Sequence, residues 1–191
     1  NPIDEAIRQF KTFDVTEYGK IAEIPYDFYR KRLSVLVAHQ SGNILVTKGA
    51  LANILDVCSE VENPDGSLTS MTEAYQQIQQ RYEDFSRQGF RTLGLAYKAL
   101  DAQEVLNKTD ENGMQFLGFL LFFDPPKEDA RAALAELAAL GVDVKVISGD
   151  NRFVARHVAS QVGLAADSVV TGGDLQELSE DALMQVAAAT V

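Results

Sequence analysis

The sequence predicts an α+β part with antiparallel strands, followed by an α/β part with a parallel sheet. Two apolar segments, residues 32–39 and 43–48, are separated by a short polar link that ends in glycine, which is typical of a β-hairpin. Residues 116–123 are apolar without alternation, as expected of a strand that is buried on both faces. From there onward strand and helix patterns alternate, which favours a parallel sheet with right-handed crossovers. We therefore expect two domains, at residues 1–115 and 116–191.

Local patterns predict each element of the first domain. Pro2 stands near the start of an amphipathic segment, and Gly89 follows a long run with apolar residues at helical spacing. These patterns and a break at Gly49 predict helices over residues 1–10, 50–57 and 72–88. Apolar segments between turn signals predict strands over residues 20–26, 32–39, 43–48 and 91–100. Asn63-Pro64-Asp65-Gly66 is a turn, and residues 108–115 form a polar loop.

The second domain is predicted to begin with the apolar strand and a rigid exit through Pro125 and Pro126. The pattern after these prolines predicts helices over residues 128–140 and 151–162, with a strand over residues 142–147 between them. So few strands would leave open sheet edges, and open edges invite pairing between chains. We therefore expect dimers, or disorder in residues 165–191.

Composition excludes several functions. The 191 residues are 46% hydrophobic and 24% charged, as in a soluble globular protein, and carry a formal net charge of −11. Nucleic acids and anionic membranes attract basic surfaces, so we expect neither as a direct partner. Cys58 alone forms no internal disulfide, and His39 and His157 lie in no ligand-like cluster. No signal peptide is visible in residues 1–10, and the longest apolar run is far below the roughly 20 residues of a membrane helix.

A segment with aromatic and basic residues is the first candidate site. Tyr26, Phe28 and Tyr29 lie beside Arg30-Lys31-Arg32 in a chain that is otherwise acidic. Aromatic rings stack on nucleobases, each contact being worth roughly 1–3 kcal/mol, and cations bind phosphates. From the residues alone the alternative is favoured: a hairpin edge with core aromatics and a solvated basic turn.

Three further junctions are candidate sites for chemistry, and each has a structural alternative. In Thr47-Lys48-Gly49-Ala50 a strand ends in a lysine, and the glycine permits close approach of a ligand. Ser148-Gly149-Asp150-Asn151 follows a predicted parallel strand, where open α/β sheets bind ligands. Asp124-Pro125-Pro126-Lys127 stiffens a strand exit. The alternatives are a plain strand–turn–helix junction, a helix N-cap at Asp150 or Asn151, and a rigid connector.

The order of these motifs resembles the P-type ATPases over nearly the whole chain, and most of all the bacterial magnesium-importing members, through residues 23–37 and 124–128. The matching motifs are Asn1-Pro2-Ile3-Asp4-Glu5-Ala6-Ile7, Pro25-Tyr26-Asp27, Arg30-Lys31-Arg32-Leu33-Ser34-Val35, Lys48-Gly49-Ala50, Gly89-Phe90-Arg91-Thr92-Leu93, Asp124-Pro125-Pro126-Lys127 and Ser148-Gly149-Asp150-Asn151. The resemblance implies an α+β nucleotide-binding domain, followed by an incomplete α/β domain similar to haloacid dehalogenases, the phosphorylation domain.

The resemblance also implies a nucleotide site in the first domain. Asp4 matches an acidic residue near the adenine, and Tyr26 matches an aromatic residue that stacks on it, with Phe28 as a competitor. Lys31 matches a cation beside the nucleotide, and Lys48-Gly49 matches the motif with the pocket lysine.

The phosphate side is implied by later motifs. Arg91 matches an arginine that reaches the phosphates when the domains close, and Asp124 lies at the hinge near the ribose. Ser148-Gly149-Asp150 matches a Thr-Gly-Asp loop that faces the transferred phosphoryl group; serine keeps the hydroxyl. Lys127 replaces a common arginine and loses its bidentate fork.

Two family motifs are missing from the sequence: Asp-Lys-Thr-Gly-Thr, with the phosphorylated aspartate, and Gly-Asp-Gly-x-Asn-Asp, which helps to hold magnesium. We therefore expect ATP binding, as Mg-ATP, without hydrolysis and without a catalytic residue or metal site here. The expected setting is the cytoplasmic face of a bacterial inner membrane, with the remaining phosphorylation, actuator and membrane domains as partners. The alternatives are a haloacid-dehalogenase-type phosphatase, which would need an Asp-x-Asp-like motif, and a non-enzymatic ligand-binding module.

Overall fold

The computed structural model describes residues 2–40, 42–100, 105–165, 169–176 and 178–189. The chain divides into two compact units: unit 1 comprises Asn1–Ala74 and Leu93–Phe119, and unit 2 comprises Tyr75–Thr92 and Leu120–Val191. The sequence-based boundary after residue 115 stays a prediction. No helix among the described residues is both long and apolar enough to cross a membrane.

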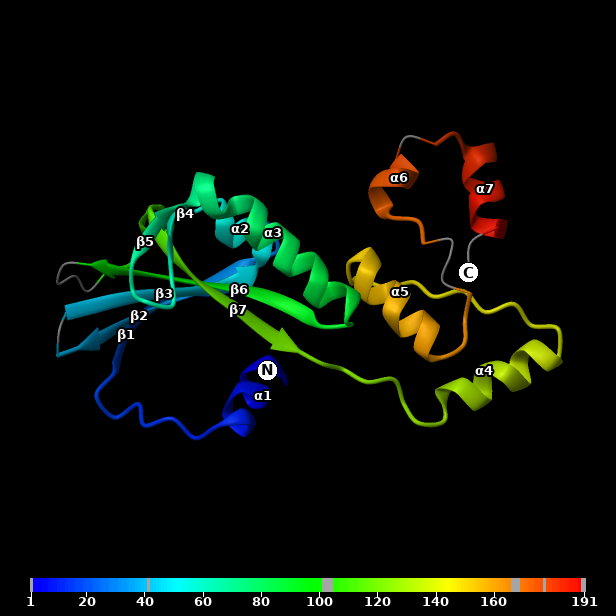
Figure 1. Cartoon of the computed structure of the whole chain (residues 1–191), viewed down its shortest axis with the longest axis horizontal. Coiled ribbons are helices and arrows are strands. Elements are labelled where there is room, and N and C mark those ends of the chain that lie inside the picture. Colours follow the sequence, from blue (N-terminus) through cyan, green and yellow to red (C-terminus); the bar gives the residue numbers. More distant parts are fainter. Residues whose placement is uncertain (1, 41, 101–104, 166–168, 177, 190–191) are drawn as a thin grey trace. The chain divides into compact units, whose positions relative to one another are not determined.

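The strands form one mixed sheet in the order β1-β2-β3-β6-β7-β4-β5 (Figure 1). They are β1 (Gly19–Ile24), β2 (Arg32–His39), β3 (Gly42–Ala50), β4 (Cys58–Glu62), β5 (Leu68–Ser70), β6 (Arg91–Leu100) and β7 (Met114–Phe122). The helices are α1 (Pro2–Phe10), α2 (Leu51–Leu55), α3 (Met71–Arg87), α4 (Ala130–Ala139), α5 (Arg152–Gln161), α6 (Gly172–Gln176) and α7 (Glu180–Ala189), with a 3₁₀ turn η1 (Lys108–Asp110).

The first four neighbours in the sheet, β1, β2, β3 and β6, pair antiparallel, which confirms the α+β class predicted for the first domain. The predicted hairpin is β2–β3, in which Arg32 lies opposite Gly49. β4 pairs parallel with β7 and antiparallel with β5, so the sheet is mixed. The predicted turn Asn63-Pro64-Asp65-Gly66 joins β4 to β5.

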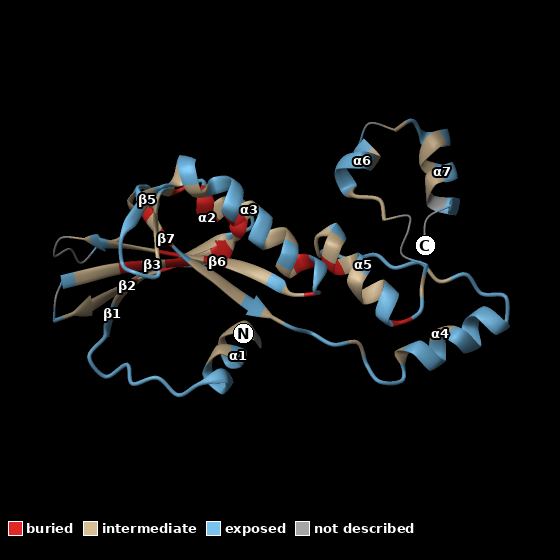
Figure 2. Ribbon diagram, in the orientation of Figure 1, coloured by how far each residue is buried: buried red, intermediate tan, exposed pale blue. Residues whose placement is uncertain are grey.

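The core of unit 1 lies on one face of this sheet. Leu36 is paired with Leu45, and both side chains are fully buried. Ile54 of α2 packs on the same face, against Gly94, where an added Cβ would lie 3.0 Å from the Ile54 side chain. Figure 2 shows the buried residues of the central strands and of α2, and α1 lies on the other side of these strands. Because side chains alternate along a strand, the neighbours of the buried residues point to that other side.

Two sequence-based expectations for the second domain are wrong. The strand predicted over residues 116–123 exists as β7, but it pairs with β4 and is not buried on both faces, since Leu117 and Leu121 are exposed. The strand predicted over residues 142–147 does not form. Its assumed neighbour β7 pairs elsewhere, and an extended segment needs a partner to satisfy its backbone groups.

The predicted helices of the second domain are present as α4 and α5. Local patterns missed β4, β5, α6 and α7. The described residues show no buried side chain in α4 or α6.

Candidate functional site

A cleft of about 450 Å³ lies in unit 1 between α1 and the face of the sheet opposite α2. Its walls contain apolar, acidic and basic side chains together. The lining residues are Asp4, Glu23, Ile24, Pro25, Tyr26, Leu33, Val35, Val46 and Lys48. Leu33 and Val35 of β2 and Val46 of β3 form an apolar floor, because they alternate with the buried residues of these strands.

The structure brings together three of the residues predicted for the nucleotide site. Asp4, Tyr26 and Lys48 all line the cleft, although more than 40 residues separate the first from the last. Lys48 donates a hydrogen bond to the Asp4 carboxylate. This hydrogen bond from Lys48 is the main cause that lowers the pKa of Asp4. The ion pair therefore joins α1 to the end of β3 across the cleft.

Tyr26 and Phe28, the two candidates for stacking, have different surroundings. The Tyr26 side chain is 50% exposed and lines the cleft, whereas Phe28 is 84% exposed and is not among the lining residues. The rings meet edge to face, with centroids 5.7 Å apart. This arrangement favours Tyr26 over Phe28 as the residue that would stack on a base.

In the basic run Arg30-Lys31-Arg32, the two arginines bind the buried carboxylate of Glu111, which the sequence analysis missed. Arg30 Nη1 lies 2.5 Å from Oε1 and 2.7 Å from Oε2 of Glu111, and Arg32 Nε lies 2.9 Å from Oε2. The Glu111 side chain is 0% exposed. Burial acts to raise the pKa of Glu111, but hydrogen bonds from Ser34, Arg30 and Arg32 outweigh it and lower the pKa. Neither arginine is therefore part of a solvated basic turn, while Lys31 is exposed.

At Gly49 another segment of the backbone comes too close for any side chain to fit. A Cβ at this position would lie 2.4 Å from the carbonyl oxygen of Lys31, which accepts a hydrogen bond of 2.9 Å from the Ala50 amide. Lys31 itself has a φ of 48°, a left-handed conformation that is uncommon for lysine. The close approach predicted for a ligand at this glycine is made here by the Lys31–Arg32 backbone.

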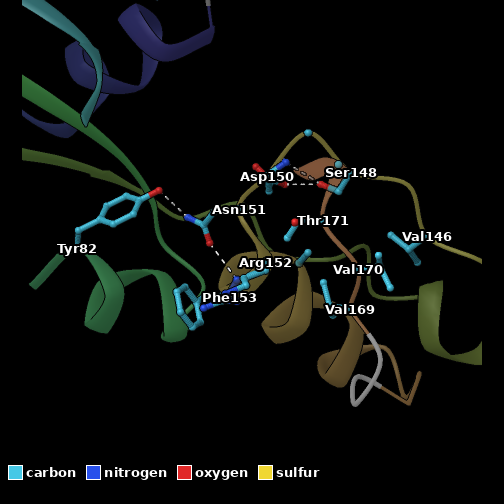
Figure 3. Close-up of a pocket in the computed structure, with 13 residues that line it drawn as sticks. Tyr82, Val146, Ser148, Asp150, Asn151, Arg152, Phe153, Val169, Val170 and Thr171 are labelled. Carbon is cyan, nitrogen blue, oxygen red and sulfur yellow. Dashed lines mark hydrogen bonds between the residues drawn. The ribbon is translucent and has the colours of Figure 1, made fainter. Parts of the chain in front are cut away.

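Unit 2 contains the residues predicted for the phosphate side. Ser148, Gly149 and Asp150 line a cavity of about 510 Å³ (Figure 3). The Ser148 hydroxyl lies 2.9 Å from Asp150 Oδ2 and accepts a hydrogen bond of 3.1 Å from the Asp150 amide. The other lining residues are Tyr82, Val146, Asn151, Arg152, Phe153, Ala155, Val169, Val170, Thr171 and Gly172.

Arg91 joins two of the predicted carboxylates. Its Nη1 lies 3.0 Å from Asp124 Oδ2, and its Nε lies 2.9 Å from Asp150 Oδ1. The hydrogen bond to Asp150 is the first cause of the raised pKa of Arg91. The guanidinium is half exposed, so solvent screens these pairs. The arginine predicted to reach phosphates is thus held by carboxylates in this structure.

Asn151 fulfils the N-cap alternative. Its Oδ1 accepts hydrogen bonds of 3.0 Å from the amides of Phe153 and Val154, at the start of α5. Its Nδ2 donates to the hydroxyls of Tyr82 and Ser86, each at 3.0 Å (Figure 3 shows the contact with Tyr82). Sequence reasoning missed both partners; their spacing of four residues, which puts them on one face of α3, was the available signal.

The described residues include no group of three or more His, Cys, Asp or Glu side chains that could hold a metal ion.

Comparisons with a protein-family model and with known proteins agree with one another. The family model described as "P-type ATPase, cytoplasmic domain N" matches residues 6–129. The chain is 40% identical over 175 residues to "Magnesium-transporting ATPase, P-type 1" of Salmonella typhimurium strain LT2, covering 91% of this chain and 19% of that protein. The protein of the same name in Escherichia coli K12 is 40% identical over 178 residues, covering 92% and 20%.

A more distant relative is "Calcium-transporting ATPase 3, endoplasmic reticulum-type" of Arabidopsis thaliana, which is 30% identical over 157 residues, covering 81% of this chain and 16% of that protein. This chain thus spans about a fifth of the length of the magnesium-transporting relatives that it matches.

Proposed function

Because this chain belongs to the P-type ATPase family, whose cytoplasmic domain N matches residues 6–129, we propose that it binds Mg-ATP in the cleft of unit 1. The observation that carries the proposal is the meeting of Asp4, Tyr26 and Lys48 around an apolar floor. In the whole protein, the bound nucleotide would be presented to a phosphorylatable aspartate outside this chain.

The chemistry of the cleft suits a purine nucleotide. The Tyr26 ring and the apolar floor offer a surface on which a base stacks, worth roughly 1–3 kcal/mol per aromatic contact. Lys48 offers a charge for the anionic part of the ligand, in competition with Asp4. Lys31 is exposed and available as a second cation. Magnesium bound to the phosphates would neutralise part of their charge, and this chain's residues would bind and orient the nucleotide.

We further propose that residues 116–191 are part of a phosphorylation domain similar to haloacid dehalogenases. The shared cavity of Ser148, Gly149 and Asp150 supports this role, because a hydroxyl and backbone amides suit a phosphoryl group. Arg91 would exchange its contacts with Asp124 and Asp150 for phosphate oxygens. Phosphoryl transfer depends mainly on such positioning and charge neutralisation.

For the whole protein we propose ATP-driven cation transport, with magnesium as the cation. The names of the relatives that are 40% identical support magnesium. The chain would then lie on the cytoplasmic face of a bacterial inner membrane, with the remaining phosphorylation, actuator and membrane domains as partners.

An ATP titration of the 191-residue chain, followed by amide NMR, tests the nucleotide site. We expect shifts near Tyr26, Lys48 and Gly49, and no release of phosphate. Replacing Tyr26→Ala removes one stacking contact of roughly 1–3 kcal/mol, which weakens binding by about fivefold to 150-fold. Lys48→Met should weaken binding by a similar factor, because it removes a charge-assisted contact.

The matched control is Phe28→Ala, which removes a neighbouring aromatic ring outside the cleft and should leave the affinity within about twofold. A larger loss for Phe28→Ala than for Tyr26→Ala would move the stacking role to Phe28. Absence of shifts at millimolar ATP would reject the nucleotide site.

A further inference from the structure

We propose that Glu111 is a positioning residue for the nucleotide cleft, acting through Arg30 on the turn that presents Tyr26. The inference rests on the proposed function, since it assigns a role in binding the same nucleotide. Glu111 lies outside the motifs that predicted the site, and it does not line the cleft.

The Glu111 carboxylate is enclosed by donors from β2 and from the turn before it. Oε1 accepts from Arg30 and, at 2.6 Å, from the Ser34 hydroxyl, and Oε2 accepts from Arg30 and Arg32. The sequence separation from Glu111 is 77 residues for Ser34 and 81 for Arg30. Both oxygens are therefore used in a buried network that local sequence cannot build.

Arg30 connects this network to the residues on both sides of Tyr26. Its Nη2 donates to the Pro25 carbonyl at 2.8 Å, and its Nε lies 2.5 Å from Asp27 Oδ2. Asp27 Oδ1 in turn accepts from the Arg30 amide at 2.7 Å. One guanidinium thus fixes the residue before Tyr26 and the residue after it. The planar fork of arginine suits such simultaneous contacts, and a lysine would not replace it.

A second arm of the network reaches the strand that carries Lys48. The Ser34 hydroxyl lies 2.7 Å from the Thr47 hydroxyl, and Thr47 directly precedes Lys48. Ser34 and Thr47 are fully buried on the face opposite the cleft, because residues alternate along β2 and β3. Glu111 therefore lies behind the cleft floor and acts on the ligand only through the backbone positions it fixes.

A purely structural role predicts a different result from a positioning role. Removing one partner of a buried ion pair destabilises a fold wherever the pair lies. A positioning role requires more: the loss in ATP affinity must depend on Tyr26. Residues that act through one another show non-additive effects in a double-mutant cycle.

The cycle compares the 191-residue chain with Glu111→Gln, Tyr26→Ala and the double variant, by ATP titration at a temperature where all are folded. We expect Glu111→Gln to weaken ATP binding about tenfold, or about 1.4 kcal/mol, in the otherwise unchanged chain. In the Tyr26→Ala background the same change should cost less than about twofold. Ile54→Val, which trims a buried core residue away from the cleft, is the control and should leave ATP affinity unchanged.

Additive effects, or an unchanged affinity in folded Glu111→Gln, would overturn the positioning role while leaving the nucleotide site intact. A wild-type chain that does not bind ATP would instead reject the proposed function, and the positioning role with it. If Glu111→Gln does not fold, Arg30→Lys replaces it in the cycle. That change keeps a cation for Glu111 but loses the fork to Pro25 and Asp27, and the same non-additivity is expected.

Discussion

Asp27 closes the turn between β1 and β2 through hydrogen bonds to its own neighbours. Its Oδ1 accepts from the Tyr29 amide at 3.1 Å and from the Arg30 amide at 2.7 Å. The backbone hydrogen bond from Arg30 is the first cause that lowers the pKa of Asp27 from 3.8 to about 2. The turn contains several aromatic residues, but its backbone is held by the carboxylate of Asp27, which accepts these hydrogen bonds in its ionised form.

The lowered pKa of Asp27 predicts a pH dependence with a definite sign. A carboxyl group whose pKa is lower in the folded chain stabilises the fold above its unfolded value, and the effect is lost as the pH falls towards the folded value. The contribution of Asp27 should therefore be complete above about pH 4 and disappear as the pH falls through about 2. NMR titration of the Asp27 carboxyl carbon measures this directly, and Asp27→Asn should flatten the acid limb of the unfolding curve. A midpoint near 3.8 would contradict the hydrogen-bonded turn.

Helix α5 depends on one residue for two functions. Asn151 caps the helix with its oxygen and bridges to Tyr82 and Ser86 of α3 with its nitrogen, all within unit 2. Ser86 is fully buried, so its hydroxyl loses a partner if Asn151 is removed. The same residue therefore fixes where the loop Ser148-Gly149-Asp150 ends and α5 begins.

Two substitutions separate the functions of Asn151. Asn151→Ala should lower the unfolding free energy of α5 by about 1–2 kcal/mol from the cap alone, and by more because Ser86 is left unsatisfied. Asn151→Ser keeps a capping oxygen, but its shorter side chain has no second polar atom to reach the two hydroxyls, so it should lose only the bridging part. Urea unfolding followed through α5 amide signals measures both. Equal losses for the two variants would show that the cap contributes little.

The accuracy of sequence-based prediction differs between elements for a physical reason. The β2–β3 hairpin and the helices α1, α3 and α5 follow from contacts between residues close in the chain, and each was predicted. β7 pairs with β4, more than 50 residues earlier in the chain, which local patterns cannot predict, and the strand expected over residues 142–147 does not form. The residues of the candidate site also differ in whether local sequence can identify them. Tyr26 and Lys48 follow from motifs, whereas Glu111 is identified only when the folded chain brings it to Arg30 and Arg32.

For the molecule as a whole, buried apolar side chains are concentrated in unit 1. Among the described residues, the buried hydrophobic side chains of unit 2 are Ile78, Val154 and Val162, whereas unit 1 contains fully buried residues in β2, β3 and α2 (Figure 2). Apolar burial is the main favourable term in folding, so the sheet of unit 1 should open only with global unfolding. Helices without buried side chains open at much lower cost.

Hydrogen exchange tests this distribution along the chain. We expect the slowest exchange in β2, β3 and β6, and exchange faster by about a hundredfold or more in α4, α6 and α7. Helix α5 should lie between these limits, since Val154 and the contacts of Asn151 anchor it. Asn151→Ala should move α5 towards the fast group without affecting β3, which provides an internal control. Protection of α4 equal to that of β3 would mean that the second part of the chain has a core of its own, as a complete α/β domain would.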